Sequence, residues 1–277
     1  MSQYERISDY PAHSLASAET ALLTVWGSLR KYWDDLVLVG GLAVYHLTKR
    51  EHPGLQSTVT MDVDFGIALA AGGDQYGTIT GDLAGLGFRL DKEKGRMVRE
   101  ENGVSLYIDF LTEHRSAHTG SIMVDDVVAS VCPGVDRALA CKRLVTVRGK
   151  DIYGQDQSYP IPMADFGPLL VLKLNAFGGR TARKHAKDAY DILLMVMAGI
   201  DGQEAAIKAF RAEATKDNSG FADAETALRT YFTAPNQDGP IYAAACLFGA
   251  NPSPDLEPRR RQVIQDMVTV GLRLLGG

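Results

Sequence analysis

The sequence predicts an α+β fold in which a sheet with flanking helices is followed by a helical C-terminal part. Segments with strand and helix periodicity alternate as far as Pro162, whereas the chain from there to Gly277 shows helical periodicity alone. The boundary is expected near residue 163, which gives predicted domains of residues 1–162 and 163–277. With 45% hydrophobic and 23% charged residues, the composition is that of an ordinary globular protein, so both parts can bury a core.

The first part is expected to open with a helix, a short strand and a tight turn. Apolar residues recur at helical spacing from Ser14, which is available as an N-cap, to Asp35. A β-prone run at 36–39 ends at Gly40-Gly41, and helical spacing resumes over 42–47. The remaining expected elements are a loop over 50–58, a strand over 59–68, a helix over 74–86, an extended segment from 87, strands over 96–99 and 104–111 joined by a turn at 101–103, and short strands over 144–147 and 159–162.

The second part is expected to consist of helices. They are predicted over about 165–199, 203–217, 221–232, 240–249 and 259–275. Gly178-Gly179 interrupts the first of these ranges, which is therefore either one long helix or two shorter ones. No internal repeat and no low-complexity tract occurs.

Composition indicates the cellular compartment and the kinds of partner to be expected. The three cysteines are too scattered for a metal site or a disulfide framework, and they are interpreted as buried thiols in a reducing compartment. No apolar run is long enough to span a bilayer and no signal peptide is evident, so we expect a cytoplasmic protein without a membrane partner. The net charge of −5 argues against a broad nucleic-acid-binding surface but allows a local basic patch.

Three aspartates are the candidate metal ligands. Asp62 and Asp64 stand two apart in an expected strand, so both side chains project from one face, roughly 6 to 7 Å apart at their Cα atoms. Asp109 interrupts the apolar strand Leu106–Leu111, where an unpaired acid is costly to bury. An isolated Asp-x-Asp is common in loops, and Asp109 could instead face solvent from an edge strand. Together, however, three carboxylates suit Mg²⁺ or Mn²⁺ and can hold two cations for phosphoryl displacement.

A glycine pair and a cationic segment are the candidate phosphate-binding features. A strand that ends in Gly40-Gly41 before a helix lets backbone N–H groups approach a phosphate, although many plain turns also contain glycine. Offsets of 7, 14 and 18 residues from Lys173 place Arg180, Lys187 and Asp191 near one helical stripe, if the helix continues through the glycines. The alternative is a solvated charged face, but the leucines around Lys173 indicate that this cation has a partner.

In order and spacing, these motifs resemble the AbiEii/AbiGii type of nucleotidyltransferase, which includes the MenT toxins. The resemblance covers roughly residues 36 to 195 and is carried by Gly40-Gly41, Thr60-x-Asp62-x-Asp64, Gly87-Phe88, Ile108-Asp109, Lys173 and Lys187-Asp188-x-x-Asp191. It implies a polymerase-beta-like nucleotidyltransferase fold with a mixed sheet and a helical C-terminal domain. It also implies that the glycines contact triphosphate, that Asp62 and Asp64 hold Mg²⁺, and that Lys173 binds phosphate with Asp191 as its partner. Gly41 stands where many nucleotidyltransferases have serine, which leaves the backbone amides to bind the triphosphate.

The function expected from the residues and the resemblance together is transfer of a nucleoside monophosphate from an NTP to an acceptor hydroxyl. Asp109 would complete the metal site and accept the proton, while Lys173, Arg180 and Lys187 would neutralise the β- and γ-phosphates. Relatives act as toxins of toxin–antitoxin or phage-defence pairs, some by modifying tRNA, so a tRNA acceptor and a cognate antitoxin are possible partners. The alternatives are an inactive nucleotide- or partner-binding module and an enzyme that modifies a small molecule such as an antibiotic.

Overall fold

The computed structural model describes residues 6–68, 78–101, 104–114, 120–124, 126–179 and 185–276. The chain forms two compact units. The sheet unit comprises Ala12–Ala43 and Thr60–Asp165, and the helical unit comprises the described part of 1–11 together with Val44–Val59 and Phe166–Gly277. The helical unit thus takes in a segment, 44–59, from the middle of the first half of the chain. The simpler division at residues 162 and 163 stays a prediction.

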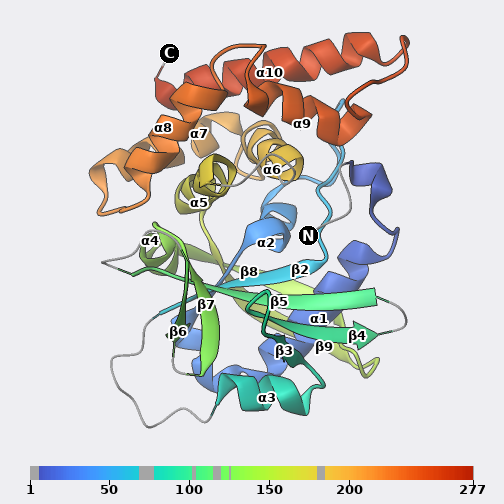
Figure 1. Cartoon of the computed structure of the whole chain (residues 1–277), viewed down its shortest axis with the longest axis vertical. Coiled ribbons are helices and arrows are strands. Elements are labelled where there is room, and N and C mark those ends of the chain that lie inside the picture. Colours follow the sequence, from blue (N-terminus) through green and yellow to red (C-terminus); the bar gives the residue numbers. More distant parts are fainter. Residues whose placement is uncertain are drawn as a thin grey trace. The chain divides into compact units, whose positions relative to one another are not determined.

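The sheet unit is built on one mixed sheet, as the sequence predicts (Figure 1). In the described chain, seven strands follow the order β3-β4-β5-β2-β1-β9-β8, and β7 pairs with β5 and with β6. Neighbours β1 and β9, β2 and β5, and β5 and β7 are parallel, and the other pairs are antiparallel. The strands are β1 Leu36–Val39, β2 Asp62–Ile67, β3 Arg89–Asp91, β4 Arg96–Glu101, β5 Val104–Thr112, β6 Ser121–Val124, β7 Val127–Val131, β8 Lys142–Lys150 and β9 Asp156–Ala164.

Helices α1 (Ser14–Ser28), α3 (Ile79–Gly85) and α4 (Val135–Ala140) also belong to the sheet unit, and α2 (Gly40–Leu47) follows β1 directly. The strand at 36–39 has the predicted bounds. The first helix ends at Ser28, earlier than predicted, and a 3₁₀ segment (Arg30–Asp35) follows it. The helix predicted over 74–86 is described from Ile79 only, because part of its range lies outside the described residues, as does most of the turn predicted at 101–103.

The hairpin of β8 and β9 is longer than the short strands predicted over 144–147 and 159–162. Each strand has nine residues, and the register runs without a break from Lys142 opposite Ala164 to Lys150 opposite Asp156. The sequence predicted the part of β9 that contains the two prolines but not its extension to Asp156 and Ala164; proline cannot donate to a ladder and usually marks an edge or a loop. Pro160 and Pro162 nevertheless lie at ladder positions opposite Thr146 and Leu144.

The two faces of β2 have different roles. Val63 and Phe65 are fully buried, and Phe65 stacks with Trp26 of α1 and with Phe110 of β5. Alternation along the strand places Asp62, Asp64 and Gly66 on the opposite face. A Cβ at Gly66 would lie 3.2 Å from a methyl group of Val135, so α4 packs on this second face at the far end of the strand. The core therefore fixes β2 from one side and leaves its two aspartates on the other.

The helical unit consists mainly of packed helices (Figure 1). They are α5 Phe166–Gly179, α6 His185–Met197, α7 Gln203–Ala212, α8 Phe221–Tyr231, α9 Asp238–Phe248 and α10 Glu257–Leu275. Helix α5 packs against α6, α7 and α8, while α9 packs against α6 and α10. Segment 44–59 joins them through a bridge between Thr48 and Gly199 and through the hydroxyl of Tyr190, which accepts from the backbone N–H of Gln56. None of the helices in the described chain combines the length and hydrophobicity needed to cross a bilayer.

Candidate active site

The three aspartates that the sequence singled out lie on one face of two neighbouring strands. Strands β2 and β5 are parallel, with Asp64 opposite Asp109 and Asp62 opposite Tyr107. Residues opposite each other on adjacent strands project to the same face, and so do residues two apart in one strand. We call Asp62, Asp64 and Asp109 the acid face. The predicted convergence of these side chains on one face is thus a consequence of the register of β2 and β5.

Arg96 lies among these carboxylates, and sequence reasoning missed it. Strand β4 is antiparallel to β5, with Met97 opposite Ile108, so Arg96 comes next to Asp109. Its Nε donates to Asp109 Oδ1 over 2.9 Å, its Nη2 donates to Asp109 Oδ2, and Nη2 lies 3.1 Å from Asp62 Oδ1. Burial lowers the pKa of the guanidinium, but the negative charges of Asp62 and Asp109 outweigh this and raise its pKa. Arg96 therefore stays charged and neutralises part of the acid face.

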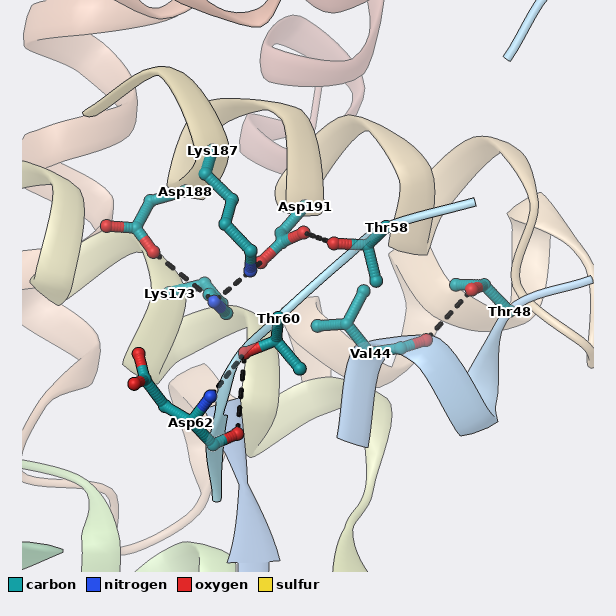
Figure 2. Close-up of polar contacts among 9 residues, drawn as sticks. All are labelled: Val44, Thr48, Thr58, Thr60, Asp62, Lys173, Lys187, Asp188 and Asp191. Atoms are coloured by element: carbon teal, nitrogen blue, oxygen red, sulfur yellow. Dashed lines mark hydrogen bonds and ion pairs between the residues drawn. The ribbon is translucent and has the colours of Figure 1, made fainter. Parts of the chain in front are cut away.

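Gly40 makes room for the Asp64 carboxylate. Val39 pairs with Asp64, and the chain turns at Gly40, whose φ is +67°. A Cβ at this position would lie 1.9 Å from Asp64 Oδ2, a distance that no pair of non-bonded atoms tolerates. The signal in the sequence, a glycine that ends a buried strand, therefore has two structural reasons: a left-handed backbone and a close approach of a carboxylate. At the N-terminal end of β2, Thr60 Oγ1 accepts from the backbone N–H of Asp62 over 3.2 Å (Figure 2).

The acid face fits a divalent cation in donor chemistry. Its members are hard oxygen donors, the class that Mg²⁺ and Mn²⁺ prefer. In the arrangement shown, the described residues contain no cluster of three or more His, Cys, Asp or Glu side chains that is ready to hold a metal ion. Asp109 is engaged through both oxygens by Arg96, which also lies against Asp62. The three-carboxylate metal site stays a prediction, with Arg96 as the feature to be explained.

A second cluster of charged residues lies in the helical unit and includes the predicted lysines. Lys173 Nζ donates to Asp191 Oδ2 over 2.7 Å and to Asp188 Oδ1 over 3.2 Å, and Lys187 Nζ donates to Asp191 Oδ2 over 2.8 Å (Figure 2). Thr58 Oγ1 donates to the other oxygen of Asp191 over 2.6 Å. We call Lys173, Lys187, Asp188 and Asp191 the lysine cluster. Helix α5 ends at Gly179, so the stripe that the sequence suggested is assembled from two helices, the second of the two arrangements considered.

Burial decides the roles inside the lysine cluster. The side chain of Asp191 is fully buried and that of Lys173 is only 8% exposed. Burial raises the pKa of Asp191, but Lys173 and Lys187 outweigh this and lower it. Burial alone would lower the pKa of Lys187, but the negative charge of Asp191 raises it by more, so the pKa of Lys187 lies above its ordinary value. Asp191 thus acts through its neighbours: it holds both amines and is shielded from solvent. The contact agrees with the expectation that Asp191 is the partner of Lys173, and the part of Asp191 in a reaction stays a prediction.

The structure places the other predicted residues as follows. Gly41 lies in the first turn of α2, which begins at Gly40 and not at residue 42 as predicted. Arg180 lies outside the described residues. The expectation that Lys173 faces the acid face joins residues of two different units and stays a prediction. Sequence reasoning missed Thr58 and Arg96. Thr58 gave no usable signal, whereas Arg96 had one, since it opens a strand beside the strand of Asp109.

Comparison with known proteins identifies the class. A family model described as "Nucleotidyl transferase AbiEii toxin, Type IV TA system" matches residues 23–266, which is most of the chain. With its mixed sheet and the carboxylates on β2 and β5, the protein is a nucleotidyltransferase. More particularly, the chain belongs to the AbiEii toxin family of nucleotidyltransferases.

A solved structure was also found to be similar. It is the solution structure of the antibiotic-resistance factor ANT(2'')-Ia, with 15% sequence identity and a TM-score of 0.32, and the match covers 71% of this chain and 95% of that one. No curated protein sequence matches the chain.

Proposed function

We propose that this nucleotidyltransferase uses Mg²⁺ to transfer a nucleoside monophosphate from an NTP to an acceptor hydroxyl, and that it is the toxin of a type IV toxin–antitoxin pair. The observation that supports the chemistry most is the pairing of Asp64 with Asp109 on adjacent parallel strands, with Asp62 on the same face. A chain of the AbiEii family that gathers three carboxylates on one surface has the donors for the metal ions of such a transfer.

In this proposal, Asp62, Asp64 and Asp109 hold the metal. Once bound, Mg²⁺ would polarise the α-phosphate and neutralise the leaving group. The acceptor hydroxyl attacks the α-phosphorus, one P–O bond forms, the bond to the β-phosphate breaks and pyrophosphate leaves. Asp109 takes the proton of the hydroxyl, because a carboxylate beside the attacking oxygen is the general base available on this face.

The remaining proposed roles concern the triphosphate. Backbone N–H groups at Gly40 and Gly41 contact its oxygens at the start of α2. Lys173 and Lys187, together with Arg180, neutralise the β- and γ-phosphates. Asp191 contacts both lysines and is itself out of solvent, so its part is to position the two amines.

The chemistry is tested by incubating the purified protein with each α-³²P-labelled NTP, Mg²⁺ and total RNA, and measuring label in the RNA. Asp64→Asn is expected to lower incorporation by at least about a hundredfold, because it removes a metal ligand without changing shape. Asp156→Asn is the matched control, since that side chain is 86% exposed on the β8–β9 hairpin. Incorporation that survives in Asp64→Asn rules out the proposed site.

Acceptor and toxicity need separate measurements. Fractionating the labelled RNA shows whether tRNA is the acceptor, and a parallel reaction with aminoglycosides in place of RNA shows whether a small molecule is labelled instead. Induced expression of the wild-type chain is expected to arrest the growth of the host cells, whereas cells that express Asp64→Asn are expected to grow normally. Arrest by the inactive variant would show that the toxin role does not depend on nucleotidyl transfer.

A further inference from the structure

The acid face contains a cation supplied by the chain itself. Arg96 contacts both oxygens of Asp109 through Nε and Nη2, and the same Nη2 lies 3.1 Å from Asp62 Oδ1. Its Cζ atom lies 4.2 Å from the centroid of the Tyr107 ring, so the guanidinium is also stacked on an aromatic side chain of the same face. The side chain is 18% exposed, less than the 40% of Asp62 and the 29% of Asp109. Arg96 is thus held by four contacts: two hydrogen bonds to Asp109, an ion pair with Asp62 and a cation–π contact with Tyr107.

In this arrangement Arg96 would compete with a divalent cation for the carboxylate of Asp109. A guanidinium that donates two N–H groups to a carboxylate occupies one in-plane lone pair on each of the two oxygens. Mg²⁺ or Mn²⁺ would bind the same two oxygens, at shorter distances and in octahedral geometry. Two positive groups cannot share these oxygens at close range without mutual repulsion. Metal binding and the observed position of Arg96 therefore oppose each other at Asp109.

We propose that Arg96 is an internal counter-ion of the acid face, which a divalent cation must displace in order to bind. This inference rests on the proposed metal site and adds a residue that opposes it. Arg96 stabilises the carboxylates in the metal-free protein, where they would otherwise repel one another. It is a positioning residue, and its effect is to lower the affinity of the free enzyme for metal.

Binding of Mn²⁺ alone, without nucleotide, tests the proposal. Free Mn²⁺ is measured by electron paramagnetic resonance for the wild type, Arg96→Met, Arg96→Lys and two controls. Arg96→Met is expected to bind Mn²⁺ about tenfold more tightly, because it removes a competing positive charge from the site. Arg96→Lys should lie between the wild type and Arg96→Met, since lysine keeps the charge and loses the bidentate contact.

The controls separate this proposal from the metal site on which it rests. Arg148→Met removes one exposed positive charge from β8, three strands away from β2 in the sheet, and should leave the affinity within about twofold. Asp64→Asn should abolish binding. Unchanged or weaker binding by Arg96→Met, with wild-type binding that depends on Asp64, overturns the counter-ion alone. Absence of binding by the wild type and by Arg96→Met overturns both proposals.

A second measurement follows Arg96 itself in the wild-type chain. In ¹⁵N-labelled protein the Arg96 Nε–Hε signal, assigned by its loss in Arg96→Lys, is followed during titration with diamagnetic Mg²⁺. Displacement from Asp109 should shift this signal with the same midpoint as metal binding, and the shift should be absent in Asp64→Asn. A signal that stays in place at saturating Mg²⁺ refutes displacement.

Discussion

Replacement of Gly40 by alanine tests the link between the turn after β1 and the acid face. The substitution adds a single methyl group, which would lie 1.9 Å from Asp64 Oδ2 and 2.5 Å from its Cγ. The carboxylate must therefore leave its place, because the other atoms in contact belong to the same side chain. The backbone at φ +67° is also unfavourable for any residue with a Cβ.

The size of the effect follows from these two terms. The left-handed backbone costs about 1–2 kcal/mol, and forcing Asp64 away from its preferred rotamer adds about 0.5–1.5 kcal/mol. Gly154→Ala separates the terms, since Gly154 has φ +77° and open space where a Cβ would lie. Urea unfolding should thus show Gly40→Ala to be destabilised more than Gly154→Ala by about 0.5–1.5 kcal/mol.

Activity gives the sharper contrast between the two variants. A displacement of a metal-binding carboxylate by about 1 Å is expected to cost about a hundredfold in transfer rate. Label incorporation from α-³²P NTP should therefore fall by that factor in Gly40→Ala and remain near the wild-type level in Gly154→Ala. Equal activity and equal stability of the two variants would refute the argument that Gly40 is required by Asp64.

Three further predictions concern the helical unit. Asp191→Ala should destabilise the helical unit by about 3–5 kcal/mol, because two lysines lose their buried partner, whereas Thr58→Val should cost about 2 kcal/mol, because it removes one hydrogen bond to a charged group. Urea titrations followed by circular dichroism compare the two variants, and equal losses of stability would contradict the ion-pair reasoning. Burial and the nearby Arg50 lower the pKa of His46 from 6.5 to about 4, so neutral His46 contributes at most about 3 kcal/mol to the free energy of unfolding above pH 6.5, and this contribution is lost as the pH falls towards 4. His46→Gln should flatten the fall in stability over this range, and an unaltered pH profile would show that His46 is not its cause. Burial raises the pKa of the Cys246 thiol to about 12, so Cys246→Ala should not change the rate at which a disulfide reagent modifies the native protein at pH 8, and loss of a fast phase in this variant would show that the thiol is accessible.

Local sequence signals sufficed for much of the sheet unit. The apolar run of β1 and the glycines after it mark a buried strand and a turn, because both depend on side chains adjacent in sequence. The period of two residues in β2 places Asp62 and Asp64 on one face whatever the neighbouring strands are. The same local reasoning found only the middle of β9, over 159–162, because the full length of this strand is set by its pairing with β8.

Pairings between distant segments could not be obtained in this way. That β5 lies beside β2 in a parallel register, with Asp109 opposite Asp64, depends on the pairing of two strands that are separated in the sequence by residues 68–103. The contact between Arg96 and the acid face follows from the next pairing, β4 with β5, and it adds a positive charge to a site that the sequence predicted as three carboxylates around a metal.

By itself, the sequence determined the alternation of strands and helices, the two aspartates of β2 and the glycine turn, because each is fixed by the conformational preferences of a few consecutive residues. Tertiary structure alone decided that Arg96 lies on Asp62 and Asp109, and that Lys173 and Lys187, on two helices, meet at a buried Asp191. These contacts depend on which elements pack together, and the favourable energy of an ion pair arises only after burial and strand pairing have brought the two charges within reach.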